Sequence, residues 1–285
     1  MRRKDWICKM VVTREDVIRG VKELGIRQGD VVLVHSSFKS LGPVEGGAET
    51  VVSGFLEVLG QEGTLVMPTL CQKDFAHSYE TWHNNKPSDT GYLTEYFRKR
   101  PGSLRSDQAT HSVAACGKAA VYLTEHHGHT QKRFGNMGDT PFSADSPWEK
   151  MYQMDAKIVM LGVTALYTTF RHYAEYVYIE ECLKALEKHP QYAVMKDRLS
   201  AWNKPGVWPH VRNIWVYEQL EQKGLVTKSC CGNAELLCYS AREFVNLTLV
   251  ALREQSEGVL WRTPAWDTDG WIAWQEEANR IVNKK

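Results

Sequence analysis

The sequence lacks the features that would assign the chain to a membrane, a secretory route or a nucleic acid. No run approaches the ~20 consecutive apolar residues of a membrane helix, and no apolar segment follows the basic N-terminus as in a secretory signal. Lys plus Arg number 35 and Asp plus Glu number 34, so the basic excess of a nucleic-acid-binding protein is missing. We therefore expect a soluble, cytoplasmic protein that binds neither nucleic acid nor membrane.

Several motifs of disulfide, nucleotide and hydrolase chemistry are also missing. The seven cysteines include no CxxC pair, and the adjacent Cys230 and Cys231 are a poor disulfide pair, which is typical of a reduced compartment. No Walker motif, GxGxxG or GxSxG occurs, so a nucleotide site and an α/β-hydrolase have no support. The histidines at 126, 127 and 129 lack the spacing of a closed zinc site. We expect a solvated loop and no metal there; a zinc hydrolase is the alternative, and bound zinc would reveal it.

The segments that are present alternate between helical stripes and short apolar strands. A variant capping box at Thr13 to Asp16 predicts the start of a helix. A helix over 48–59 separates apolar strands at 31–34 and 64–67, which predicts parallel pairing through a right-handed crossover. Further strands are expected at 112–117 and 157–163. This order predicts an α/β protein.

Longer polar segments interrupt this order. Residues 71–110 predict a surface excursion with one short helix near 94–98, and the pattern weakens again from 187 to 209. Helices are expected at 212–223, after a capping box at 240–243, and in the tail at 261–285. The tryptophans of the tail are expected in the core or, if exposed, on a dimer surface; they stand at 261, 266, 271 and 274.

One stretch, 168–176, combines the residue types of acid–base chemistry. It follows an apolar strand, and the apolar spacing then becomes helical. His172 and Glu175 are three residues apart, so on a helix they share a face. A carboxylate can orient an imidazole and stabilise its protonated form. The alternative is that His172 caps or packs while Glu175 is solvated.

Three chain segments that follow strands contain polar residues. They are His35-Ser36-Ser37, Pro68-Thr69 and 168–175. In a parallel sheet these ends line one edge, where open α/β sheets usually bind ligands. Hydroxyls and backbone N–H groups at such turns suit phosphate or pantetheine amides.

In several blocks the sequence resembles the aminoglycoside 3-N-acetyltransferase family, which is distinct from the commoner GNAT acetyltransferases. The blocks run from about residue 14 to about 255 and are specific jointly rather than singly. They are VHSSFKSLG at 34–42, GGAETV at 46–51, GTLVMPT at 63–69, RS at 105–106, THSVAA at 110–115, DSPW at 145–148, the Thr169/His172/Glu175 motif and GNAE at 232–235.

The resemblance implies a three-layer-like α/β sandwich with a largely parallel or mixed central sheet flanked by helices. It implies one domain over 1–285, with 70–110 and 187–212 as excursions on the acceptor side. Acetyl-CoA would be the donor and an amine the acceptor, with His172 as general base and Glu175 completing the motif. Thr169 or backbone N–H groups could steady the oxyanion. The expected acetyl-CoA contacts are His35, Ser36, Ser37, Thr69, Ser112, Val113 and Ser146. For His111, a structural role and a place in the CoA groove are equally expected.

The sequence departs from the family pattern at two loops and in one charged region. Gln108-Ala109 stand where the family usually has His-Pro, and Ser143 stands where it usually has Gly. Residues 196–212 lack the dense carboxylates of aminoglycoside-binding members. The acceptor therefore stays open between an aminoglycoside, an amino sugar and another biosynthetic amine. A CoA-binding protein without catalysis and a homodimer also stay open.

Overall fold

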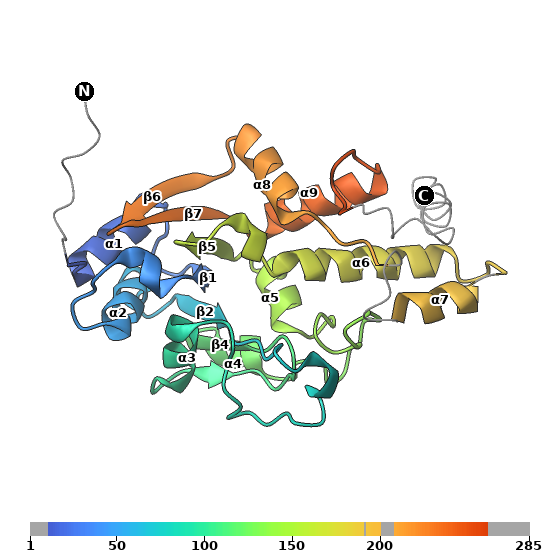
Figure 1. Cartoon of the computed structure of the whole chain (residues 1–285), viewed down its shortest axis with the longest axis horizontal. Coiled ribbons are helices and arrows are strands. Elements are labelled where there is room, and N and C mark those ends of the chain that lie inside the picture. The colour runs from blue at the N-terminus through green and yellow to red at the C-terminus, as the bar shows by residue number, and fades with distance from the viewer. Residues whose placement is uncertain (1–10, 191, 201–207, 262–285) are drawn as a thin grey trace.

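A seven-stranded mixed sheet organises the described part of the chain (Figure 1). The computed structural model describes residues 11–190, 192–200 and 208–261. The strands are ordered β3-β4-β2-β1-β5-β7-β6. Their bounds are β1 Val31–Ser36, β2 Thr64–Pro68, β3 Leu104–Arg105, β4 Val113–Gly117, β5 Lys157–Leu161, β6 Thr227–Cys231 and β7 Ala234–Ser240.

The centre of the sheet is parallel and both flanks are antiparallel. Strand β1 pairs in parallel with β2 on one side and with β5 on the other, as the crossover rule predicts. Strands β4 and β7 run antiparallel to β2 and β5. Val113 at the start of β4 pairs with Pro68 at the end of β2. The polar segment that leads into β4 therefore also lies at the carboxyl edge of the parallel strands.

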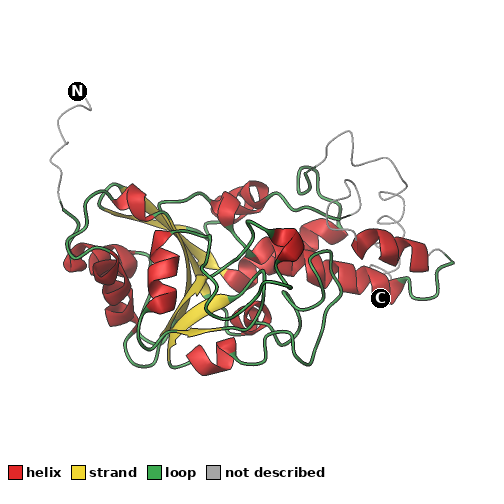
Figure 2. Cartoon of the chain, turned by 60° about the horizontal axis from the view of Figure 1, so that its bottom comes forward, coloured by secondary structure: helices red, strands yellow, loops and turns green. Residues whose placement is uncertain are grey.

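Helices cover both faces of the sheet and complete the sandwich (Figure 2). On one face α1, α2 and α3 share a core with Val32 and Val34 of β1. On the other face α4, α5, α6, α8 and α9 share a second core with Leu33. This alternation along β1 is the period of two expected of a strand that is buried on both faces. The helices are α1 Arg14–Glu23, α2 Ala48–Leu59, α3 Tyr92–Lys99, α4 Ala120–Thr124, α5 Pro147–Gln153, α6 Phe170–Ala185, α7 Tyr192–Ser200, α8 Asn213–Gln222 and α9 Ala241–Arg253.

Local signals placed several of these helices correctly. The capping box at Thr13 is present, with both reciprocal hydrogen bonds to Asp16. The Ser240 side chain accepts a hydrogen bond from the Glu243 backbone at the start of α9. Helix α2 spans the predicted 48–59. The prediction of an α/β sandwich with a mixed sheet is confirmed.

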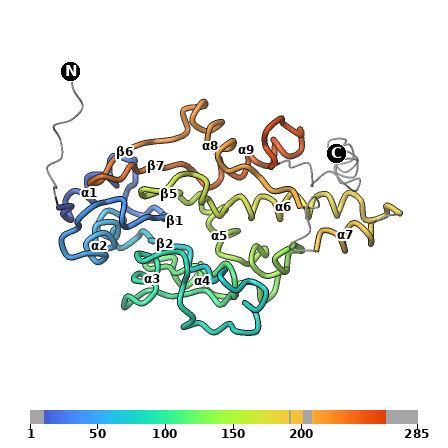
Figure 3. Tube along the Cα trace, in the orientation of Figure 1, coloured from blue at the N-terminus to red at the C-terminus, as the bar shows by residue number. Residues whose placement is uncertain are grey.

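Other elements were not predicted. Residues 227–240 form the β6–β7 hairpin at one edge of the sheet (Figure 3). Its turn needs Gly232, which has a φ of 56° and whose Cβ would meet the Leu41 carbonyl oxygen at 2.3 Å. Helix α7 lies in the segment where the apolar pattern had weakened.

The predicted tail helix at 261–285 lies outside the described residues from 262 onward. The same is true of the tryptophans at 266, 271 and 274, whereas Trp261 is 43% exposed. Within the described ranges, no helix has the length and apolar character needed to cross a membrane.

Candidate active site

His172 and Glu175 form a hydrogen-bonded pair in the first two turns of α6. The Nδ1 atom of His172 lies 3.0 Å from Oε2 of Glu175. The fully buried carboxylate also accepts hydrogen bonds from Trp208 Nε1 at 3.0 Å and from the Val211 backbone N–H at 2.9 Å. An ionised carboxylate only accepts, so the geometry assigns the proton to Nδ1 and leaves the lone pair on Nε2.

The electrostatics of the pair favour a neutral base beside an ionised carboxylate. Burial and the adjacent Arg171 cation lower the pKa of His172 from 6.5, against the opposing effect of Glu175. Burial alone would raise the pKa of Glu175, but the charge and hydrogen bond of His172 bring it down to about 2. At neutral pH His172 can therefore accept a proton.

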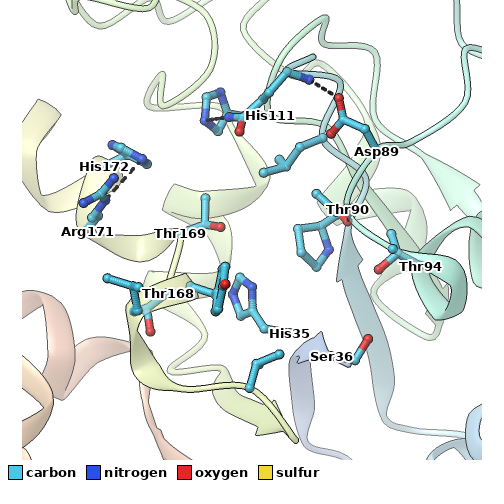
Figure 4. A pocket seen from close by; sticks show the side chains of 17 residues that line it. His35, Ser36, Asp89, Thr90, Thr94, His111, Thr168, Thr169, Arg171 and His172 are labelled. Carbon is cyan, nitrogen blue, oxygen red and sulfur yellow. Dashed lines mark hydrogen bonds between the residues drawn. The ribbon is translucent and has the colours of Figure 1, made fainter. Parts of the chain in front are cut away.

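The pair lies at a cavity of about 540 Å³ at the carboxyl edge of the parallel strands. His35 and Ser36 reach it from β1, Pro68 from β2, and Thr169 and His172 from the segment after β5 (Figure 4). The predicted convergence of three strand ends is confirmed. The remaining lining residues are Leu70, Gln72, Asp89, Thr90, Gly91, Thr94, His111, Val163, Leu166, Tyr167, Thr168 and Arg171.

One lining residue has a buried polar atom that no described residue satisfies, and a second makes no helix-cap hydrogen bond. His35 is only 6% exposed, and its Nε2 has no hydrogen-bond partner in the described structure; burial lowers its pKa to about 4. Thr169 precedes α6 without making a side-chain cap hydrogen bond. Buried polar groups are normally paired, so Nε2 of His35 indicates a ligand in the cavity.

The other five expected acetyl-CoA contacts do not line this cavity. Ser37 lines an adjoining hollow of about 830 Å³, which shares Val163 and Tyr167 with the first. Thr69 and Ser112 are fully buried and hydrogen-bonded to each other at 3.0 Å. Val113 is also fully buried. Ser146 is buried as well, and its hydroxyl caps α5 by accepting from the Glu149 N–H at 3.3 Å; these assignments stay predictions.

Arg105 fastens the wall that contains Thr69 and Ser112. Its guanidinium donates to the Thr69 carbonyl at 2.7 Å, to the Thr69 and Ser112 hydroxyls at 3.2 Å each, and to the Asn84 carbonyl at 2.9 Å. It also bonds the Lys86 carbonyl. The partly buried side chain of Arg105 thereby ties the excursion at 70–110 to the sheet edge.

The two loop departures from the family pattern are hydrogen-bonded into the structure. Gln108 accepts from the Thr110 backbone N–H at 2.8 Å and from that of His111. His111 is fully buried, lines the cavity, and its ring centroid lies 5.7 Å from that of His172. Ser143 donates to Asp145 at 2.6 Å. His111 is therefore both a structural residue and a wall of the cavity.

The histidine cluster after α4 divides into exposed and buried members. His126 and His129 are exposed, whereas His127 is buried and bonded to the Ser106 hydroxyl at 2.9 Å and the Pro141 carbonyl at 3.0 Å. The expectation of a solvated loop is thus wrong for His127. In the described part of the chain, no three His, Cys, Asp or Glu residues are grouped as metal ligands.

Sequence reasoning missed several residues of this site. Trp208 and Val211 bind Glu175; Trp208 lies in the segment where the pattern weakens, and Val211 follows it directly. Gln72 and Asp89 line the cavity from within the polar excursion, where nothing distinguishes them from solvated neighbours. Arg171 had a detectable signal, because it directly precedes His172 in the motif.

Comparison with known proteins identifies relatives over most of this fold. The family model described as aminoglycoside 3-N-acetyltransferase matches residues 33–253. Aminoglycoside N(3)-acetyltransferase VII of Streptomyces paromomycinus is 31% identical over 182 residues, which cover 58% of this chain and 60% of that protein. Aminoglycoside N(3)-acetyltransferase III of Serratia marcescens is 24% identical over 283 residues, covering 89% and 91%. The first alignment therefore spans less than two thirds of the relative's length.

Solved structures share the fold at low sequence identity. The apoenzyme of aminoglycoside acetyltransferase AAC(3)-IVa has a TM-score of 0.69 at 20% identity, covering 95% of this chain and 99% of that one. The AAC-IIIb binary complex with CoASH has a TM-score of 0.66 at 16% identity, covering 90% and 100%.

Proposed function

Because the chain belongs to the aminoglycoside 3-N-acetyltransferase family, we propose that it is an acetyl-CoA-dependent N-acetyltransferase. It moves an acetyl group to a primary amine of an aminoglycoside or an amino-sugar-like acceptor. His172 acts as the general base in a ternary complex. The single observation that carries this proposal is the oriented, neutral His172 imidazole at the edge of a cavity that is also lined by the unpartnered Nε2 of His35.

The residues of the cavity fit acetyl-CoA as the donor. The unpartnered Nε2 of His35 and the hydroxyl of Ser36 lie at the end of β1 and can meet amide or phosphate oxygens of the donor. Ser37 extends the same turn into the adjoining hollow. Thr69, Ser112, Val113 and Ser146 would act mainly by shaping the wall, because their polar atoms are already engaged. The fold shared with AAC-IIIb, solved with CoASH, supports this assignment.

The chemistry follows from the position of each group. The acceptor nitrogen attacks the acetyl carbon, so a C–N bond forms as the C–S bond to CoA breaks. Nε2 of His172 takes the proton that the amine loses, and that proton then neutralises the departing CoA sulfur. The hydroxyl of Thr169 can donate to the acetyl oxygen as negative charge develops there. Holding both substrates together supplies much of the rate, so no acetylated enzyme is needed.

The acceptor is an amine that binds beside His172. Structures of AAC(3)-IVa in complex with a gentamicin and with apramycin support an aminoglycoside. We take 1–285 as one domain, with the excursions at 70–110 and 187–212 bordering the acceptor. In the structure, 70–110 supplies Gln72 and Asp89 to the cavity, and the Trp208 to Val211 segment holds Glu175.

Thiol release from acetyl-CoA tests the proposal. Wild type, His172→Ala and the control His129→Ala, an exposed histidine outside the cavity, are assayed with aminoglycosides and amino sugars. We expect acceptor-dependent release that falls roughly 10²- to 10⁴-fold in His172→Ala and is unchanged in His129→Ala. Calorimetry shows whether His172→Ala still binds CoA.

Two outcomes would contradict the proposal. If His172→Ala turned over as fast as wild type, His172 would not be the general base. CoA binding by wild type without turnover of any acceptor would instead favour a binding protein that does not catalyse transfer.

A further inference from the structure

Arg171 places a cation beside the base, and this cation forms no salt bridge to a carboxylate in the described part of the chain. Its Nε donates to Nε2 of His172 at 3.3 Å (Figure 4), and its Nη1 donates to the Val211 carbonyl at 3.4 Å. Arg100, Arg133 and Arg253, in contrast, each contact a glutamate. The guanidinium at the cavity is therefore available to an anion.

The nearest negative charge to Arg171 is the buried, ionised Glu175, four residues further along α6, which attracts the guanidinium without forming a salt bridge to it. Arg171 lies in the first turn of α6, and that turn contains no acidic residue. The amino end of a helix dipole favours negative charge and disfavours a cation. The adjacent His172 would also repel it once protonated. Glu175 offsets these two effects from a distance, and a bound anion would offset them by direct contact.

Apart from Glu175, which bonds the base from behind and does not line the cavity, the cavity supplies little negative charge. Asp89 is the carboxylate among its described lining residues, and it already accepts from the Gln72 and Lys73 backbone N–H groups at 2.6 and 2.7 Å. The glutamates at 218, 221 and 235 line the adjoining hollow instead. An acceptor with several ammonium groups would therefore meet the cation of Arg171 in a cavity whose described lining holds one carboxylate, Asp89.

We propose that Arg171 binds an anionic group of the acceptor, so that the preferred acceptor is an amine that also carries a nearby carboxylate or phosphate. The proposal deepens the proposed function and rests on it. The phosphates of acetyl-CoA are separated from its thioester by the long pantetheine arm. Because the thioester must lie at His172, those phosphates cannot also lie at Arg171.

The hydrogen bond between Arg171 and His172 links binding of the acceptor to the availability of the catalytic lone pair. In the structure, the lone pair that His172 needs for catalysis accepts the N–H of Arg171. An acceptor anion that pairs with the guanidinium draws this donor away and leaves Nε2 open to the amine. Arg171 suits this task because its planar fork pairs with carboxylate or phosphate in two parallel hydrogen bonds.

Matched acceptors test the proposal. Glucosamine is compared with glucosamine 6-phosphate and with glucosaminate, which add a phosphate or a carboxylate to the same amine, and gentamicin serves as the polycation. The proteins are wild type, Arg171→Ala, Arg171→Lys and the control Arg242→Ala, whose side chain bonds the Gln153 carbonyl away from the cavity.

We expect wild type and Arg242→Ala to prefer an anionic acceptor over glucosamine in kcat/KM by roughly 10- to 100-fold, as for a charge-assisted hydrogen bond. The preference should fall toward one in Arg171→Ala, mainly through KM, and return in part in Arg171→Lys. The proposal is overturned if wild type uses gentamicin better than both anionic acceptors. It is also overturned if Arg171→Ala slows all acceptors equally, and that result would leave the N-acetyltransferase function standing.

If no acceptor is turned over, binding measurements distinguish failure of the anion site from failure of the N-acetyltransferase function. Calorimetry with CoA present then compares glucosamine 6-phosphate with glucosamine on wild type and Arg171→Ala. Tighter binding of the phosphate that depends on Arg171 would keep the anion site and reject the catalytic function. Equal binding would reject both.

Discussion

The two walls of the cavity differ in how completely their polar groups are satisfied. On the wall built from 69–112, Thr69 and Ser112 bond each other, and Arg105 bonds both along with three backbone carbonyls. On the opposite wall, Thr169 makes no cap hydrogen bond and Arg171 forms no described salt bridge. Nε2 of His35, between the walls, has no described partner at all.

The wall with satisfied polar groups therefore serves as scaffold, and the opposite wall serves binding and catalysis. A closed network has no bonding capacity left for a ligand, and breaking it leaves buried acceptors without donors. Unsatisfied groups cost stability in the free protein and are retained where a ligand completes them. Substitutions on the first wall should therefore change stability, and substitutions on the second should change catalysis.

The largest expected effect is at Glu175, on the catalytic side. Glu175→Gln would turn an amide N–H toward one of the donors that now bind the carboxylate, and it would release the imidazole from its orientation. We expect kcat/KM to fall roughly 10²- to 10⁴-fold. The carboxylate raises the pKa of His172, so this pKa should be lower in the variant. The fall of the remaining activity on the acid side of the pH–rate profile should therefore begin at a lower pH than in wild type.

Rate measurements across pH check this prediction. Glu181→Gln is the matched control, since Glu181 lies on the same helix and pairs with Arg253. A Glu175→Gln protein with full activity would contradict the role of the pair.

The next effect is at Arg105, on the scaffold side. Arg105→Ala leaves the carbonyls of Thr69, Asn84 and Lys86 without this donor. We expect the free energy of unfolding to fall by about 3 kcal/mol. Urea denaturation measures it, with Arg19→Ala as the control, because Arg19 is 60% exposed and forms a surface pair that contributes ~1 kcal/mol or less. Equal stability of Arg105→Ala and wild type would mean that Arg105 does not fasten the wall.

The smallest expected effect is at Thr169. Thr169→Val removes a hydroxyl that makes no cap hydrogen bond, so stability should change little. The loss of one hydrogen bond to a charged oxygen predicts a roughly 10-fold fall in kcat. Thr169→Ser keeps the hydroxyl and should recover most of the rate. If Thr169→Val unfolds more readily but turns over normally, Thr169 belongs to the scaffold.

The sequence was sufficient for the elements that have a local cause. Capping at Thr13 and Ser240, and the unbroken apolar run of β1, depend on neighbouring residues alone. The hairpin at 227–240 depends on the fold instead: β6 is an edge strand, mostly exposed, without an alternating pattern.

The site divides in the same way. The motif predicted His172 and Glu175 because three-residue spacing on a helix places them together. Trp208 and the Val211 backbone reach Glu175 from more than thirty positions along the chain, and such long-range partners leave no local signal. The missing partner of His35 Nε2 and the lack of a described salt bridge at Arg171 are likewise properties of the packed structure.

The most direct test of the account is the protonation state of His172, followed by NMR of protein labelled with ¹⁵N-histidine and assigned with the His172→Ala variant. We predict a neutral ring at pH 7, with the proton on Nδ1 and a bare Nε2, and a titration midpoint below 6.5. A proton on Nε2 at pH 7, or a midpoint above 6.5, would contradict the assignment of His172 as the base.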